Sequence, residues 1–140
     1  MRMSKSLMLA ALGSIALFAS AVPTAFAEDA KPAKITPVFG EKLPNVPGNS
    51  ITGILVEYEP GGKTAAHRHA GSVMAYVLSG AIRSENSATG PVRVYKAGES
   101  FFEPAGSIHL VSENASTTEP ASLLAIFVAE DGATLTMPGK

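Results

Sequence analysis

From Ile51 onward, the chain alternates between short apolar runs and clusters of turn-forming residues. The runs are rich in β-branched and aromatic side chains, and the breaks between them contain Gly, Pro, Asn or Ser. No segment after residue 27 repeats apolar side chains at the helical period over about 11 residues. The pattern therefore predicts an all-β barrel or sandwich. The expected strands are Ile51–Tyr58, Val73–Leu78, Ala81–Glu85, Val92–Tyr95, Glu99–Glu103, Ile108–Ser112, Leu123–Val128 and Thr134–Met137.

Residues 1–27 have the three parts of a secretory signal peptide. Two basic residues near the N-terminus precede an apolar stretch at residues 7–22, and the segment ends in an Ala-x-Ala pattern at residues 25–27. The apolar stretch is shorter than the ~20 residues that a membrane span needs. We therefore expect cleavage after Ala27, no membrane anchor after cleavage, and a periplasmic or secreted protein.

Residues 28–50 predict an extended, proline-rich arm that precedes a single domain at residues 51–140. The arm contains four prolines and shows little periodicity. We expect a solvated tail, with the alternative that the arm covers an edge strand of the domain.

The composition excludes several kinds of chemistry. The 140 residues carry a formal net charge of −1 with no run of like charges, which argues against a nucleic-acid partner. The absence of cysteine excludes disulfides, thiolate zinc sites and Fe–S clusters. A metal would therefore need nitrogen or oxygen ligands, and the three histidines are the first candidates.

Two glycine-bounded motifs hold all three histidines. The first, residues 61–80, contains His67 and His69, which flank a single residue. If both lie on one strand, the period of two directs both imidazoles to the same face. A pair of imidazoles placed in this way can hold one metal ion. The second motif, residues 98–109, ends in His109.

The spacing of the two motifs resembles that of single-domain cupins of the small conserved-barrel type. The first family motif is G, five residues, H-x-H, three or four residues, E, six residues, G. The second is G, five residues, P-x-G, two residues, H, three residues, N. Val73 stands where the first motif has its Glu, and Asn114 comes one residue late. The matching positions are Gly61, His67, His69, Gly80, Gly98, Pro104, Gly106 and His109.

This resemblance implies a double-stranded β-helix, or jelly-roll barrel, in which His67, His69 and His109 bind one divalent metal ion. We expect iron before copper, zinc, nickel or manganese, because a Val at position 73 removes the hard oxygen donor that favours manganese. The loss also leaves more coordination positions open to water, dioxygen or a chelating substrate. Sites with three histidines resemble those of non-haem iron dioxygenases that bind a substrate through two oxygens.

Whether another carboxylate replaces the missing one stays open, and Glu103 is the carboxylate expected to be more than a solvated charge, because two phenylalanines precede it and a tight turn follows. We predict that Glu103 acts catalytically, either as a base beside the metal or as a hydrogen-bond partner that orients a ligand histidine. The other nearby carboxylates are expected to be solvated charges, as glutamate is rarely buried unless paired. They are Glu57, Glu59 and Glu113.

Several apolar and basic side chains have two interpretations. Met74, Tyr76 and Phe102 are expected in the barrel core or at an interface, with the alternative that they line the metal pocket. Arg68 and Arg83 are expected on a solvated face, with the alternative that they anchor an acidic substrate.

Two functions remain after these exclusions. The first is an exported, non-haem metal-dependent dioxygenase or related oxidoreductase that acts on a small enolic, phenolic or dicarbonyl compound. The second is a noncatalytic cupin that binds a metal ion or small ligand in the periplasm. Open coordination positions favour the enzyme, because catalytic metal sites keep them and structural sites do not. The expected partner is a small molecule, and the resemblance also leaves open a homodimer formed through edge strands or the N-terminal arm.

Overall fold

The computed structural model describes residues 31–139. All the regular elements in this part of the chain are β-strands. The eight segments predicted from the sequence each overlap an observed strand, so the all-β class is confirmed. In chain order the strands are β1 Lys34–Lys42, β2 Asn49–Tyr58, β3 Lys63–Thr64, β4 His67–His69, β5 Ser72–Ser79, β6 Ala81–Asn86, β7 Gly90–Lys96, β8 Ser100–Glu103, β9 Ile108–Asn114, β10 Ala121–Glu130 and β11 Thr136–Pro138.

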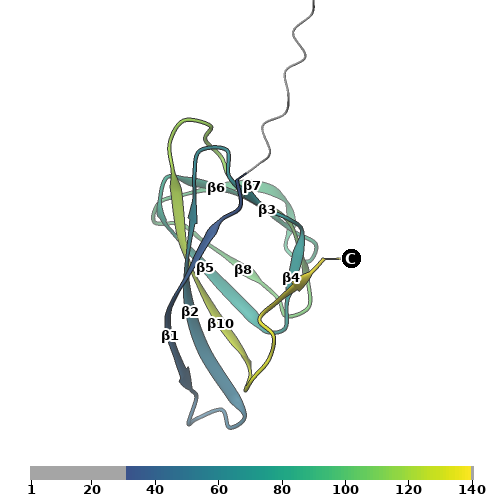
Figure 1. Ribbon diagram of the computed structural model, residues 1–140. Coiled ribbons are helices and arrows are strands. Elements are labelled where there is room, and N and C mark those ends of the chain that lie inside the picture. The colour runs from purple at the N-terminus through teal and green to yellow at the C-terminus, as the bar shows by residue number, and fades with distance from the viewer. Residues whose placement is uncertain (1–30, 140) are drawn as a thin grey trace, which may run out of the picture.

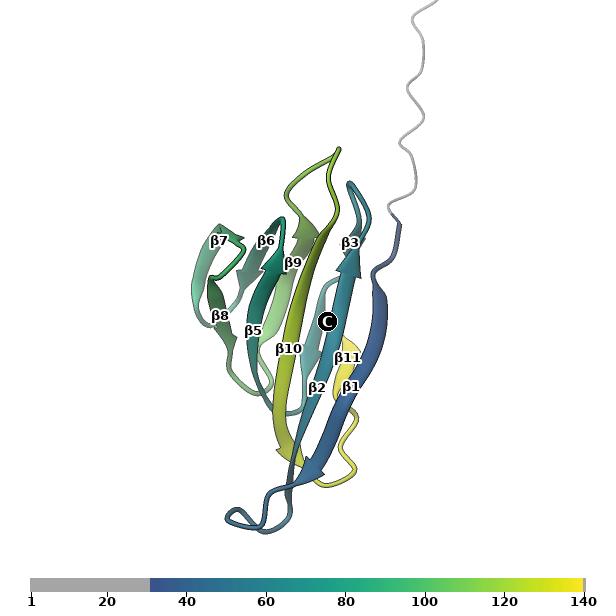
Figure 2. The ribbon, with the colours of Figure 1, turned by 90° about the vertical axis from the view of Figure 1, so that its left-hand side faces the viewer.

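The strands form two antiparallel sheets that face each other (Figure 1). One sheet has the order β1-β2-β10-β5-β8, and Figure 2 shows these strands side by side. The other has the order β11-β4-β9-β6-β7, with β3 paired to β9. Most neighbours within a sheet are distant in sequence, because the chain crosses repeatedly between the two sheets. This is the jelly-roll arrangement that the resemblance of the two motifs implied.

The core lies between the sheets, on one face of each strand. Along β5 the buried residues are Val73, Ala75 and Val77, which alternate with exposed positions. The same alternation runs through β10, where successive side chains point to opposite faces of the sheet. Among the largest fully buried side chains are Phe127 of β10 and Ile82 of β6.

Met74, Tyr76 and Phe102 lie on the outer face of the first sheet, where they are 39%, 41% and 51% exposed. The core and pocket assignments are therefore both wrong for these three residues. The reason is that β5 is apolar at consecutive positions from Val73 onward. A period of two then separates two faces without indicating which of them is buried.

Strand β1 belongs to the predicted arm and pairs with the edge of the first sheet. Lys34 lies opposite Glu57, and Lys42 lies opposite Ser50. The register shifts just after Pro37, as expected for a proline on an edge strand. Over its described part, the arm thus covers an edge and is not a solvated tail. The predicted signal peptide lies outside the described residues.

Between residues 31 and 139, the chain contains no helix with the length and apolarity to cross a membrane.

We expect Ile82→Ala to lower the free energy of unfolding by about 2–5 kcal/mol, because truncation of a buried side chain leaves a cavity. Ile82 is 0% exposed. Urea unfolding followed by circular dichroism measures the effect. The matched control is Ile35→Ala on β1, where the side chain is 53% exposed, and its cost should stay below about 1 kcal/mol. Equal losses in the two variants would contradict the placement of the core.

Candidate metal centre

Strands β4 and β9 bring the three predicted histidines together. His67 and His69 of β4 both line a cavity between the sheets, whereas Arg68 between them is exposed. Because β4 and β9 are antiparallel neighbours, His67 lies directly opposite His109. The ring centroid of His67 is 4.8 Å from that of His69 and 5.0 Å from that of His109. The three imidazoles therefore share one face of the sheet, as the spacing of the motifs predicted.

Backbone carbonyls hold one nitrogen of each histidine on β4. Nδ1 of His67 donates to the carbonyl of Ala65 at 2.8 Å, and Nδ1 of His69 donates to the carbonyl of Leu135 at 2.9 Å. A carbonyl only accepts hydrogen bonds, so Nδ1 carries the proton in both rings. The Nε2 atoms are consequently left with lone pairs, as in metal-binding histidines whose other nitrogen is held by an acceptor.

His109 is held through its other nitrogen. Its Nε2 lies 2.8 Å from Oγ of Ser84, and both side chains are buried. Its Nδ1 is buried without a hydrogen-bond partner, which is uncommon for a polar atom inside a protein. One ligand atom from each of the three histidines lies within 4.8 Å of the other two. Three imidazoles that each bring one nitrogen into this space could hold a metal ion.

Burial lowers the pKa of His67 despite the hydrogen bond to Ala65, and the charges of His109 and His69 act in the same direction as burial. At pH 7 this imidazole is therefore neutral. A neutral ring is the form that binds a metal ion.

Glu103 lies beside the histidines and is only 3% exposed. Its Oε2 is 3.1 Å from Nδ1 of His109 and 3.8 Å from Nε2 of His69. Burial alone would raise the pKa of Glu103, but contact with His109 and the charges of the three imidazoles outweigh burial and hold the pKa below its ordinary value. The carboxylate is therefore ionised at neutral pH.

The contact between Glu103 and His109 is not an aligned hydrogen bond. The distance of 3.1 Å is short enough, yet Nδ1 of His109 has no hydrogen-bond partner, so the pair does not meet the angular requirements of a hydrogen bond. The two atoms are close neighbours, and both residues line the cavity.

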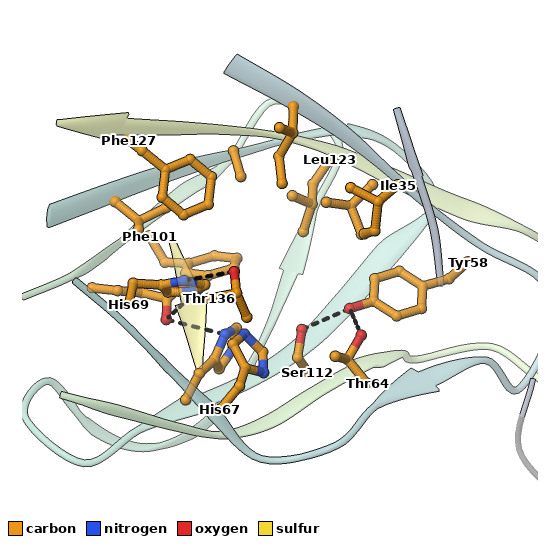
Figure 3. Close-up of a pocket in the computed structure, with 16 residues that line it drawn as sticks. Ile35, Tyr58, Thr64, His67, His69, Phe101, Ser112, Leu123, Phe127 and Thr136 are labelled. Atoms are coloured by element: carbon orange, nitrogen blue, oxygen red, sulfur yellow. Dashed lines mark hydrogen bonds and ion pairs between the residues drawn. The ribbon is translucent and has the colours of Figure 1, made fainter. Parts of the chain in front are cut away.

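The histidines lie at one end of a cavity of about 310 Å³ between the two sheets (Figure 3). The Phe127 ring packs edge-on against the His69 ring, with 5.0 Å between their centroids. Apolar walls with a few convergent polar groups are typical of sites for small molecules. The apolar side chains of the wall include Ile54, Val56, Val73, Phe101, Leu123, Ala125 and Phe127.

A second polar group lies at the other end of the cavity (Figure 3). The hydroxyl of Tyr58 is 2.9 Å from Oγ1 of Thr64 and 2.7 Å from Oγ of Ser112. These residues and Ser84 were not predicted as site residues, because hydroxyl side chains are common on strands and these lie outside the motif positions. A usable signal was the alternation in β2, which places Tyr58 on the same face as Val56.

A glycine turn holds the two motifs against each other. Gly106 has a φ of +76°, in the left-handed region that glycine adopts without strain. Its N–H donates to the carbonyl of His69 at 2.8 Å. The turn that follows Glu103 is thereby attached to β4, and this attachment fixes the carboxylate relative to the histidines.

The remaining charged candidates lie outside the cavity. Glu57 pairs with Lys34, and Glu113 pairs with Arg83, each at 2.8 Å on the surface. Arg68 is exposed. The expectation of solvated charges is confirmed for these residues, and neither arginine lines the cavity where it could anchor a substrate.

Comparisons with known proteins agree with this geometry. The family described as "Cupin domain" matches residues 54–127, slightly more than half of the chain. A curated relative, "Germin-like protein subfamily 2 member 2" from Arabidopsis thaliana, is 31% identical over 114 residues. The match covers 73% of this chain and 51% of the relative, so the chain spans about half the length of that protein.

Two of the solved structures that are similar to this chain differ in how much of it they cover. An uncharacterized conserved protein with a double-stranded β-helix domain, from Klebsiella pneumoniae, has a TM-score of 0.60 and 21% identity, covering 81% of this chain and 89% of its own. A mutant of Bacillus subtilis oxalate decarboxylase has a TM-score of 0.52 and 29% identity, covering 63% of this chain and 23% of its own. The first likeness shows the fold alone.

Replacing His67, His69 or His109 with alanine should weaken the binding of a divalent metal by more than about 100-fold. Loss of a metal ligand lowers the affinity more than loss of a group that only orients a ligand, which typically lowers it by about 10- to 100-fold. Isothermal titration and the metal content of the purified protein measure the change. Arg68→Ala is the control, because Arg68 lies between two of the histidines but is exposed. Alanine variants that bind metal as tightly as the natural protein would contradict the site.

Proposed function

The chain belongs to the cupin family, and from that premise we propose that it is an exported metal-dependent oxidoreductase of the dioxygenase type. Its substrate would be a small enolic, phenolic or dicarbonyl compound. The observation that carries this proposal is the convergence of three imidazole nitrogens at one end of an apolar cavity. Three protein ligands leave coordination positions open, as catalytic metal sites do.

The donor atoms favour a metal that accepts imidazole, with iron as the first choice and copper, zinc, nickel or manganese as alternatives. A bound metal would supply open positions for oxygen ligands and, for iron or copper, the capacity for electron transfer. The residues of this chain supply the surroundings of the metal and the substrate. Its apolar walls exclude water, and the size of the cavity restricts the substrate to a small molecule.

The polar groups of the cavity suggest how a substrate would be oriented. Oxygen atoms of an enol, phenol or dicarbonyl would face the histidines, while the apolar body would contact Phe127 and Leu123. Any further polar group could bond to the hydroxyls of Tyr58 and Ser112 at the opposite end.

Glu103 is the proposed proton acceptor. Among the described residues that line the cavity, it is the single carboxylate. It is ionised and lies at the metal end. An acidic O–H group that enters the cavity could therefore transfer its proton to Glu103 and bind as an anion.

The comparisons support a small-molecule function. The oxalate decarboxylase is named for a small substrate that carries several oxygen atoms, and it is 29% identical to this chain over the part that matches. That part is 23% of the decarboxylase, so the reaction itself is not carried over to this chain.

An oxygen electrode tests the proposed reaction. Iron-loaded protein should consume dioxygen when mixed with members of a panel of catechols, enols and 1,3-dicarbonyl compounds, and mass spectrometry should find oxygenated products. His109→Ala should show no consumption, whereas Arg68→Ala should match the natural protein. A natural protein that binds metal but consumes no dioxygen with any compound would overturn the enzyme proposal and favour a noncatalytic binding protein.

Export is tested by the N-terminus of the protein that accumulates in its native cells. We expect it to begin at Glu28 and to be found in the periplasmic or secreted fraction. Ala27→Asp should block cleavage, because the residue before the cleavage site must be small. Ala30→Asp, beyond that site, is the control and should be processed normally. A full-length protein in the cytosol would contradict export.

A further inference from the structure

In the first cupin motif, position 73 on β5 is a glutamate. In this chain the residue is Val73, which is 1% exposed. In the pairing of β5 with β8, Val73 lies directly opposite Glu103. Residues directly opposite each other in an antiparallel pair point to the same face of the sheet. Glu103 therefore enters the cavity beside the place where the motif's carboxylate would have been.

The surroundings of Glu103 do not explain its burial as an ordinary ion pair. No lysine or arginine is among the described residues that line the cavity. Its polar neighbours are His109, His69 and Asn86, whose Nδ2 is 3.4 Å from Oε2. A buried carboxylate whose polar neighbours are imidazoles and one long amide contact, with no lysine or arginine, is costly unless a cation is present.

The two histidine nitrogens nearest to Oε2 of Glu103 are both free. Nε2 of His69 is free because Nδ1 of that ring is bound to the carbonyl of Leu135. Nδ1 of His109 has no partner, and it carries a lone pair in the tautomer whose Nε2–H donates to Oγ of Ser84. Two lone pairs and one anionic oxygen therefore meet in a single buried space.

We propose that Oε2 of Glu103 is the fourth ligand of the metal, supplied from β8 in place of the carboxylate that β5 lacks. Ligand atoms about 2.1 Å from one metal ion lie roughly 3 to 4 Å from one another. The distances of 3.1 Å to His109 and 3.8 Å to His69 fall in that range. The inference rests on the metal site proposed above.

A fourth ligand from β8 changes the expected choice of metal. The donor set becomes three imidazoles and one carboxylate, despite the valine at position 73. A carboxylate oxygen neutralises part of the metal's charge. A site that contains one therefore prefers Mn²⁺ and Fe²⁺ more strongly than a site of three imidazoles alone does. Glu103 also stays within reach of a substrate on a neighbouring position, so its proposed role as proton acceptor is retained.

Two variants test this assignment. Glu103→Gln keeps the shape of the side chain and can still accept a hydrogen bond, but it removes the anionic ligand. We expect it to lower Mn²⁺ affinity by at least about tenfold, to lower Zn²⁺ affinity less, and to change the visible absorption bands of bound Co²⁺. The double variant Val73→Glu/Glu103→Val moves the carboxylate across the strand pair and should regain the Mn²⁺ affinity.

The matched control is Glu113→Gln, which alters a surface carboxylate paired with Arg83 and should change none of these values. If Glu103→Gln binds Mn²⁺ with natural affinity and gives an unchanged Co²⁺ spectrum, the inference is overturned while the metal site stands. A folded double variant without restored Mn²⁺ affinity would also count against it, and if that variant does not fold, Glu103→Gln decides alone. Absence of metal binding in the natural protein would overturn the proposed function as well.

Discussion

The antiparallel pairing of β4 with β9 is the interaction on which the rest of the site depends. It places His67 opposite His109, and the alternation along β4 adds His69 to the same face. Although β4 has only three residues, it is also paired on its other side, where Thr136 of β11 lies opposite His69. With hydrogen-bonded neighbours on both sides, the backbone holds the imidazoles in place before any ligand arrives. A site organised in this way loses little conformational freedom on binding.

Placing polar side chains inside an apolar barrel has a desolvation cost that only specific partners offset. For His67 and His69 the partners are backbone carbonyls, and for His109 the partner is the hydroxyl of Ser84. After these bonds are counted, Nδ1 of His109 has no partner, and the carboxylate of Glu103 accepts only a long contact of 3.4 Å from the Asn86 amide. A divalent cation would satisfy both. This distinguishes the cluster from core histidines whose nitrogens are all bonded.

The cavity contains polar groups besides the histidines. Its two polar ends, the histidines and the Tyr58 hydroxyl with its partners, are separated by apolar walls. A small molecule held there would meet different polar groups at its two ends, so its orientation would be restricted. Val73 and Glu103 are paired positions on neighbouring strands, so a carboxylate at either position would enter the same cavity. Register partners share a face, so the side chain reaches the site from either strand.

By itself, the sequence determined eight of the eleven described strands, the turns between them and the two motifs that carry the histidines, because alternation and turn propensity are local properties of the chain. It did not predict the strands β1, β3 and β4. The period of two along β4 also predicted that His67 and His69 share a face. Only the tertiary structure decided that Val73 faces inward and Met74 outward, since a run that is apolar on both faces does not reveal which face another sheet covers. The edge pairing of β1, the support from Ser84 and the entry of Glu103 from β8 were likewise decided there. Each depends on contacts between strands far apart in the sequence, and those contacts exist only once the two sheets have packed together.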